Sequence, residues 1–359
     1  MYSFDRIFYM LIWLWTMIFS GFGIIASHSK LKLPVIIFSL LFFFMSIFFG
    51  SRKKILQNYS EILPEKKVKR VLLFIFLLLV IKLAVLGIPL ISNNPNVDRV
   101  IFMNKNKFFY DNLNLMIYIG LTHLAIVKGK NIYLYAFIVA LFGLLSGFRS
   151  IMVFPFVYVF VAQGLDAGRI RINLINYKIY IYLLIVSIPM VYLTYVRFGA
   201  SNVWTAINLL FYRIFGMNVL NVENIVELYS TASHPNPLLL DLYSIFTDKP
   251  GFSGYVTEQF NKETFDLFQL TPTVFGEGYA LLGYSFSYIY PVVLFIVVWS
   301  LFRIYRRSNY LFIKLSVSIS LSMLLLTLNQ GFGTYLFLMV PKLLIALISY
   351  IGLSNLRLR

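Results

Sequence analysis

The sequence predicts an all-α, polytopic integral membrane protein. Of its 359 residues, 60% are hydrophobic and 13% are charged, whereas an ordinary soluble domain is about 45–50% apolar and about 25% charged. Apolar runs that approach the length of about 20 residues needed by a bilayer-crossing helix recur along the chain. These runs are continuous rather than alternating, which favours membrane helices over the short alternating strands of a membrane barrel.

Ten spans are predicted, seven before a long polar interruption and three after it. They are Ile7–Ile25, Pro34–Gly50, Val71–Ile91, Leu113–Val127, Ile132–Gly147, Ile151–Gln163, Ile179–Tyr195, Tyr284–Phe302, Tyr310–Leu328 and Thr334–Leu353. Several are shorter than about 20 residues, so we expect their ends to extend into flanking segments or the helices to tilt. The chain then divides into residues 1–196 (seven spans), 197–283 (one large external loop) and 284–359 (three spans).

The cations set the predicted orientation. The loop Ser51–Arg70 holds seven Lys and Arg, which places it in the cytoplasm by the positive-inside rule. Alternation of ten spans then puts eighteen cations on the cytoplasmic side and ten outside, with both termini cytoplasmic. The net charge of +17 therefore indicates orientation in a membrane rather than a nucleic-acid partner. The first span is expected to be uncleaved, and the lack of cysteine excludes disulfides and thiolate metal sites.

The stretch Arg197–Gly283 is the long departure from the apolar sequence, and it holds eight of the fourteen carboxylates. Its segment Val203–Leu220 is apolar but carries Trp and Arg, which predicts an interfacial helix at headgroup depth. The proline-rich Ser233–Pro237 cannot lie inside a helix. Because everything around it is membrane helix, this stretch is where chemistry outside the lipid is expected.

Three arginines are predicted at the outer headgroup depth: Arg149 between two spans, Arg197 after the seventh span, and Arg213 in the interfacial helix. Arginine binds phosphate oxygens through a planar fork of donors, so the three could form a diphosphate clamp. Binding of lipid headgroups would also explain them. Lys82 and Lys342 lie inside apolar spans, where charges are rare and usually functional. Lys82 could join the clamp, or either lysine could simply extend its ammonium toward the membrane surface.

Glu277 and His234 are the candidate proton acceptors of the external stretch. Glu277 stands between Gly276 and Gly278, and these glycines would let the backbone approach a ligand closely. The alternative is an ordinary acid in a turn. His234 could act as a general base, or be a solvated histidine of a proline-rich loop. The sequence contains no metal-ligand cluster and no phosphate-binding glycine loop, so neither a metal nor another cofactor is expected.

Two short stretches carry a resemblance to a known family. Gly147-Phe148-Arg149-Ser150 is similar to a Gly-x-Arg-Ser at a helix end, and Gly276-Glu277-Gly278-Tyr279, with Gly283 before a span, is similar to a Gly-Glu-x-Tyr motif. Together with one large external loop between late spans, they make the chain resemble the Wzy-type O-antigen polymerases. The related ligases have an external histidine motif that Ser233-His234-Pro235 matches poorly.

The resemblance implies a metal-independent glycosyltransferase of the bacterial inner membrane. Its substrate would be an undecaprenyl-diphosphate-linked oligosaccharide, and its partners membrane lipids, a flippase and a chain-length regulator. Arg149, Arg197, Arg213 and Lys82 would bind the diphosphate, and Glu277 or His234 would accept the proton of the attacking hydroxyl. Tyr279 and Tyr284 would stack on sugars.

Two other functions remain open. One is a flippase for the same lipid-linked sugar, although such exporters often have short loops and an internal repeat, neither of which is seen here. The other is an O-antigen ligase or a related membrane transferase.

Overall fold

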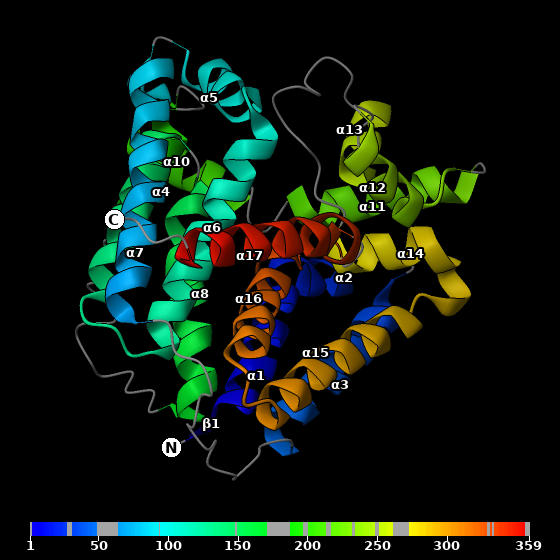
Figure 1. Ribbon diagram of the computed structural model, residues 1–359. Coiled ribbons are helices and arrows are strands. Elements are labelled where there is room, and N and C mark those ends of the chain that lie inside the picture. Colours follow the sequence, from blue (N-terminus) through cyan, green and yellow to red (C-terminus); the bar gives the residue numbers. More distant parts are fainter. Residues whose placement is uncertain are drawn as a thin grey trace.

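Helices make up nearly all of the regular structure in the described part of the chain, which confirms the all-α prediction (Figure 1). The computed structural model describes residues 2–26, 31–48, 64–92, 94–147, 149–170, 187–196, 200–212, 217–231, 234–247, 251–260, 273–328, 331 and 334–355. Within these residues, β structure is limited to an antiparallel pair of two-residue strands, β1 (Tyr2–Ser3) and β2 (Arg169–Ile170).

The N-terminal span runs continuously from Phe4 to Ala26. Helix α1 (Phe4–Thr16) passes through a π-helical turn, η1 (Met17–Gly21), into α2 (Phe22–Ala26). Ser20 donates to the Thr16 carbonyl oxygen at 3.1 Å in this turn, and such side-chain bonds compete with the regular helix ladder. Helix α3 (Lys32–Phe48) packs back along α1 through aromatic contacts such as Tyr9 with Phe42.

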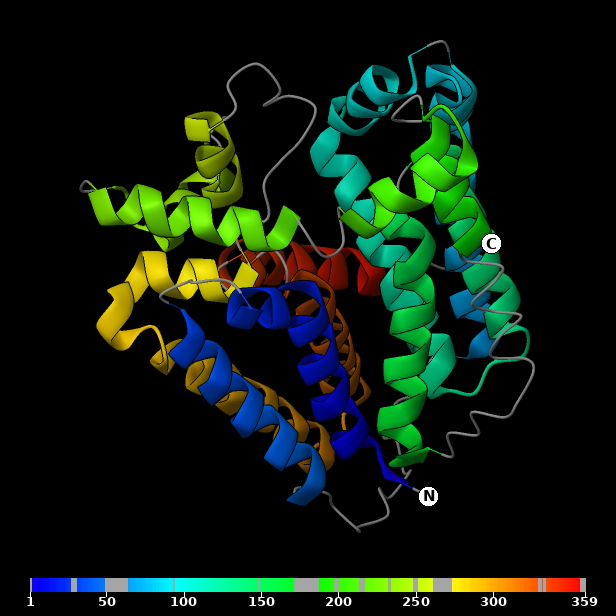
Figure 2. The same cartoon turned by 180° about the vertical axis from the view of Figure 1, so that it is seen from behind.

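The next four long helices stand upright and form a group of their own (Figures 1 and 2). They are α4 (Glu65–Leu86), α6 (Lys107–Ile126), α7 (Ile132–Leu145) and α8 (Arg149–Ala167), with the 3₁₀ turn η2 (Pro89–Ile91) and the short α5 (Pro95–Asn104) between α4 and α6. Tyr118 on α6 stacks on Tyr158 of α8 with ring centroids 4.6 Å apart. Close packing of large side chains therefore holds α6 at the centre of this group.

The described residues of the stretch 197–283 lie mostly in helices. These helices are α10 (Val203–Phe211), α11 (Met217–Thr231), α12 (Pro237–Phe246), α13 (Phe252–Phe260) and α14 (Thr273–Phe286). Residues 234–236 lie between α11 and α12 outside any helix, as the prolines predict. Asp241, which is buried, accepts from the Phe252 backbone N–H at 2.9 Å and so fixes the start of α13. The expected interfacial helix 203–220 instead falls on two helices, α10 and α11.

The C-terminal part contains α15 (Ile289–Arg307), α16 (Leu311–Thr327), the π-helical turn η5 (Thr334–Met339) and α17 (Val340–Asn355). Helix α16 is upright and α15 runs obliquely beside α3, whereas α11, α14 and α17 run crosswise in both views (Figures 1 and 2). The predicted tenth span is therefore helical, but its helix α17 crosses α6 instead of running beside it.

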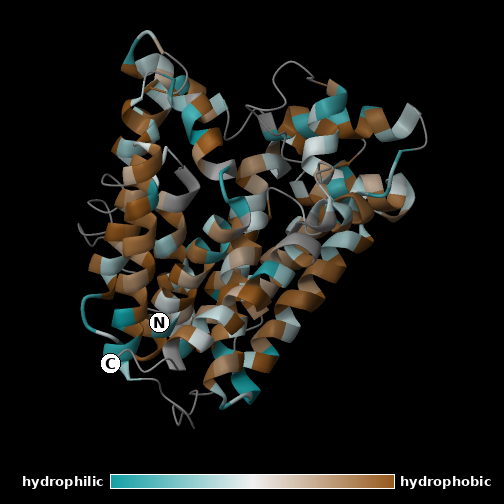
Figure 3. Cartoon of the chain, turned by 45° about the horizontal axis from the view of Figure 1, so that its top comes forward, coloured by the Kyte–Doolittle hydropathy of each residue, from teal (hydrophilic) through white to brown (hydrophobic). Residues whose placement is uncertain are grey.

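Among the described residues, three helical segments are long and apolar enough to cross a membrane, which indicates a membrane protein. They are Phe4–Ala26, Glu65–Ile91 and Ile289–Arg307. Shorter apolar helices occur at Lys32–Phe48, Ile132–Leu145, Met152–Ala167, Ser187–Val196, Leu311–Thr327 and Val340–Leu353. Apolar residues dominate the upright helices, and polar residues gather toward the ends (Figure 3).

Candidate functional site

Glu277 lies in the first half of α14 and has no exposed surface. The Tyr290 hydroxyl, from the first turn of α15, donates a hydrogen bond to Glu277 Oε2. The chain between them bends at Gly283, whose φ of +68° breaks the helical geometry of α14. This bend turns the chain from the crosswise α14 into the oblique α15, and it brings Tyr290 back onto the Glu277 carboxylate.

The glycines around Glu277 serve close packing of protein against protein. A Cβ added at Gly276 would lie 3.0 Å from Ile225 Cδ1 of α11, and one added at Gly278 would lie 3.1 Å from Tyr290 Cβ. A Cβ at Gly331 would lie 2.6 Å from Glu277 Oε2. The sequence suggested that Gly276 and Gly278 admit a ligand, but in this conformation they allow close approach of α11 and α15. Gly331 in turn allows close approach of the Glu277 carboxylate.

A fully buried carboxylate is costly unless it is hydrogen-bonded, so its presence needs a reason. Glu277 sits where α11, α14, α15 and the segment after α16 meet, and Tyr290 supplies a matching donor. Glu277 is therefore the strongest functional candidate in the described residues.

His234 is also held by a tyrosine. Its Nδ1 lies 2.8 Å from the Tyr255 hydroxyl, and its ring centroid lies 5.1 Å from that of Tyr229. Tyr229 donates to the Pro235 carbonyl oxygen at 2.9 Å. Burial raises the pKa of both Tyr229 and Tyr255 above the ordinary tyrosine value, and the charge of Glu258 adds to the rise at Tyr255. Both hydroxyls therefore stay protonated at neutral pH and remain available as donors.

His234 Nε2 is buried without a hydrogen-bond partner in the described structure. The imidazole is thus not the freely solvated ring of a proline-rich loop, which was one of the two expectations. One nitrogen is occupied and the other is enclosed, so a substrate would have to displace neighbours to reach it. In both candidate bases, Glu277 and His234, a tyrosine hydroxyl contacts the ionisable group and fixes its position.

The turn between α7 and α8, where Arg149 was predicted to bind phosphate, is described only in part. Gly147 has a φ of +77° and ends α7, and α8 begins at Arg149. The Arg149 side chain, Arg197 and Arg213 lie outside the described residues. Their predicted association is therefore still a prediction.

Arg99 is a residue at this turn that the sequence did not single out. It is only 9% exposed, and its Cβ and Cδ lie 3.6 and 3.8 Å from where Gly147 would carry a Cβ. The sequence placed it among the outer-loop cations. The only sequence signal for its burial was Pro95, which starts the short helix α5 and so predicts that Arg99 lies in a helix.

The two lysines within apolar spans have different surroundings. Lys82 Nζ donates to the Lys105 carbonyl oxygen at 3.0 Å and lies 3.9 Å from the centre of the Tyr110 ring. Lys342 Nζ lies 2.7 Å from Asp111 Oδ2, which joins α17 to α6. Asp111 is the second residue that the sequence did not single out. These contacts give both ammonium groups partners within the protein.

The two candidate sugar-binding aromatics also differ. Tyr279 is 7% exposed and packs in the main apolar core, so its ring has little surface to offer a sugar in this conformation. Tyr284 is 52% exposed. The structure therefore leaves Tyr284 as the accessible one of the pair.

Comparisons with known proteins give no relative. No family model, no curated protein and no solved structure matches this chain. Within the described ranges, no group of three or more His, Asp or Glu side chains is arranged to hold a metal ion.

Proposed function

We propose that this chain polymerises lipid-linked oligosaccharide repeat units of a bacterial surface polysaccharide at the outer face of the inner membrane. The observation that carries the proposal is the enclosed, tyrosine-bonded Glu277 within the Gly-Glu-x-Tyr stretch. The apolar helices and the turn at Gly147, with Arg99 packed against it, support it. The assignment to the Wzy-type family itself is part of this proposal and rests on the two sequence stretches.

The proposed reaction transfers the growing glycan from polyprenyl diphosphate to a new lipid-linked unit. The terminal sugar hydroxyl of the new unit attacks the anomeric carbon of the donor, and the bond from that carbon to the diphosphate oxygen breaks. The diphosphate leaves with the bonding electrons, and the proton of the hydroxyl passes to Glu277 or His234. Cations aimed at the departing oxygen stabilise the developing charge, which is the role proposed for Arg149, Arg197 and Arg213.

Burial sets a requirement on this mechanism. Because Glu277 has no exposed surface, the backbone at Gly331 or the Tyr290 ring has to move before a sugar hydroxyl can approach the carboxylate. Closure and opening of such segments commonly accompany reactions in water-excluded sites. His234 would similarly have to leave Tyr255.

A flippase for the same lipid-linked sugar is the second candidate function. The Asp111–Lys342 pair favours it, because ionisable groups between apolar helices often line transport pathways.

The deciding experiment is the profile of surface polysaccharide on a gel after deletion of the gene. A polymerase mutant keeps a lipid core that bears one repeat unit but loses the longer ladder. Loss of the single-unit band as well would contradict the proposal and indicate a flippase, a ligase or an earlier enzyme. Complementation with Arg149→Ala and with Glu277→Gln, at equal membrane levels, then tests the site. If both variants restore the full ladder, the site assignment is wrong.

A further inference from the structure

A pocket lies at the end of the bundle that carries the N-terminus, away from Glu277. It has a volume of about 320 Å³ and is formed by the last turns of α6 and α8 and the turn after α6. It is lined by Ala125, Lys128, Gly129, Gln163, Asp166 and Ala167.

Lysines outnumber carboxylates around this pocket. Lys128 Nζ lies 3.7 Å from Asp166 Oδ2, with the lysine side chain 65% exposed and the aspartate side chain 3% exposed. Lys314 of α16, which is buried, also interacts electrostatically with Asp166. Asp166, the carboxylate among the lining residues, therefore interacts with two lysines, so its negative charge is offset.

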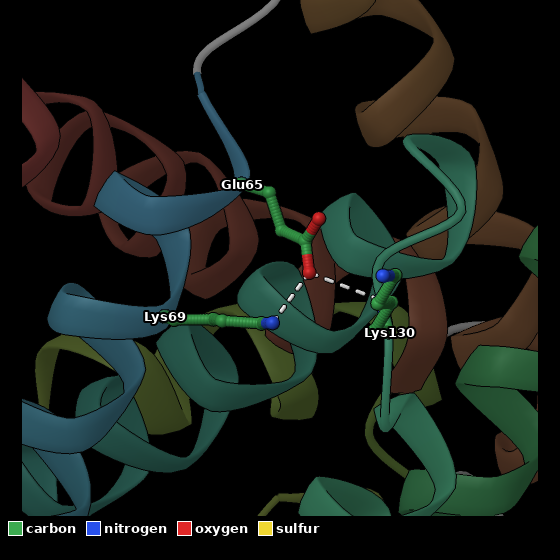
Figure 4. A network of polar contacts seen from close by, with 3 residues as sticks. All are labelled: Glu65, Lys69 and Lys130. Carbon is green, nitrogen blue, oxygen red and sulfur yellow. Dashed lines mark hydrogen bonds and ion pairs between the residues drawn. The ribbon is translucent and has the colours of Figure 1, made fainter.

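A second carboxylate links this pocket to the start of α4 (Figure 4). Glu65 pairs with Lys69 and accepts from the Lys130 backbone N–H at 3.0 Å. Its carboxyl carbon lies 3.5 Å from where Gly129 would carry a Cβ, so it adjoins the pocket directly. The ammonium group of Lys130 is not used in this backbone bond. Lys128 and Asn131, both with left-handed φ, fix the turn that presents the lysines.

An apolar path leads away from the pocket along α7. Tyr133 donates to Gln163 Oε1 at 2.7 Å, which leaves the amide nitrogen of Gln163 as a donor at the pocket. Tyr133, Phe137 and Leu141 are 52%, 46% and 45% exposed and follow each other at intervals of four residues. Such spacing places them on one face of the helix. A charged pocket thus opens onto an exposed apolar stripe.

We propose that this pocket binds the headgroup of an anionic phospholipid such as phosphatidylglycerol. The phosphate would meet Lys128, Lys130 and the Gln163 amide, and the acyl chains would lie along the Tyr133–Phe137–Leu141 stripe. Basic pockets between helices at a membrane surface recognise anionic lipids in this way, and apolar stripes cover acyl chains. The inference is independent of the proposed polymerase activity.

The test uses the full-length protein in neutral detergent and native mass spectrometry. Phosphatidylglycerol is compared with phosphatidylcholine of identical acyl chains and with inorganic phosphate. The double variant Lys128→Gln/Lys130→Gln is compared with Lys66→Gln/Lys67→Gln, which removes the same charge from exposed positions in the first turn of α4. We expect retained phosphatidylglycerol adducts on the wild type, weakened by about fivefold for each pocket lysine lost, and an unchanged level in the α4 variant.

Control variants and ligands distinguish the anionic lipid from other possible occupants of the pocket. Because Lys128→Gln also removes a partner of buried Asp166, Lys130→Gln alone, which keeps the backbone bond to Glu65, must show part of the loss. Phe137→Ser must weaken binding of the diacyl lipid and leave the preference for phosphatidylglycerol over phosphatidylcholine unchanged. Equal binding of phosphatidylcholine, equal loss in the α4 variant, or equal retention of inorganic phosphate would overturn the proposal. A dimer mass without lipid adducts would instead assign the pocket to a second copy of the chain.

Discussion

Glu277 and His234 are each held by a tyrosine hydroxyl, from α15 and α13 respectively. A hydroxyl that donates to a carboxylate stabilises its charged form and fixes its orientation. At the scale of single residues, the proposed proton acceptors are therefore positioned groups rather than solvated ones. Tyr290 and Tyr255 can be changed without touching the acceptors themselves.

Tyr290→Phe should destabilise the protein by about 1.5–3 kcal/mol, because it leaves an oxygen of buried Glu277 without its donor. Thermal unfolding in detergent measures the effect. In a double-mutant cycle with Glu277→Gln, the two changes should not add. Tyr284→Phe, at an exposed position of α14, is the matched control and should have no effect. Additive losses for Tyr290 and Glu277 would show that the two side chains do not interact.

Gly331→Ala should cost about 2–4 kcal/mol, since it combines left-handed backbone strain with overpacking against Glu277. Two other glycines separate these causes. Gly283 has a φ of +68° but open space around it, so Gly283→Ala should cost about 1–2 kcal/mol. Gly352 has open space and no such strain, so Gly352→Ala should be neutral or slightly stabilising. Equal losses at Gly331 and Gly283 would mean that the contact with Glu277 is unimportant.

At the scale of helices, a polar seam joins α17 to α6. Besides the Lys342–Asp111 ion pair, Asn112 Nδ2 lies 3.5 Å from Ser349 Oγ, and His123 Nδ1 lies 3.0 Å from the Tyr350 hydroxyl. Polar contacts between apolar helices fix the register of one helix on another. The seam explains why α17 crosses α6 where it does, and it gives Lys342 a structural role.

Lys342→Met should therefore destabilise the protein by about 1–2 kcal/mol, because it removes the ion-pair partner of Asp111 between helices. The value is small because both side chains are about one quarter exposed. The exchanged pair Asp111→Lys/Lys342→Asp should recover part of the loss. Thermal unfolding is again the measurement, and Lys66→Met at an exposed position is the control. A loss at Lys66 equal to that at Lys342 would contradict an ion pair of structural importance.

At the scale of the whole molecule, the two regions of interest lie apart. The helices α11–α14, with Glu277 and His234, occupy one end, and the N-terminus with the basic pocket occupies the other (Figure 1). This separation agrees with the proposed orientation, in which the external stretch faces away from the cytoplasm and the cation-rich loops face it.

The natural lack of cysteine makes this orientation directly measurable. Single cysteines at Trp204 of α10 and Leu239 of α12, which are 69% and 51% exposed, should react with a membrane-impermeant maleimide in intact spheroplasts. A cysteine at exposed Lys66 should react only after lysis. The opposite pattern would invert the topology and exclude an external site.

The fold class and the position of most predicted spans follow from the sequence alone. Hydropathy is a local property, and a long apolar run has to satisfy its backbone within itself, so α1, α3, α4, α7 and α16 could be read from residues close in the chain. The prolines at 235 and 237 likewise marked the break between α11 and α12. Glu277 could be chosen because a carboxylate between two glycines, before an apolar run, is unusual.

The surroundings of these residues depend on how distant helices pack. The burial of Glu277 depends on Tyr290 and Gly331. Lys342 pairs with Asp111, which lies 231 residues away in the chain. The burial of Arg99 depends on its packing against Gly147. The crosswise placement of α11, α14 and α17 depends on the same contacts. Each of these contacts joins segments that are far apart in the chain. No local sequence pattern encodes which distant helix supplies the partner. For this reason the sequence could nominate Glu277 but not show that it is enclosed.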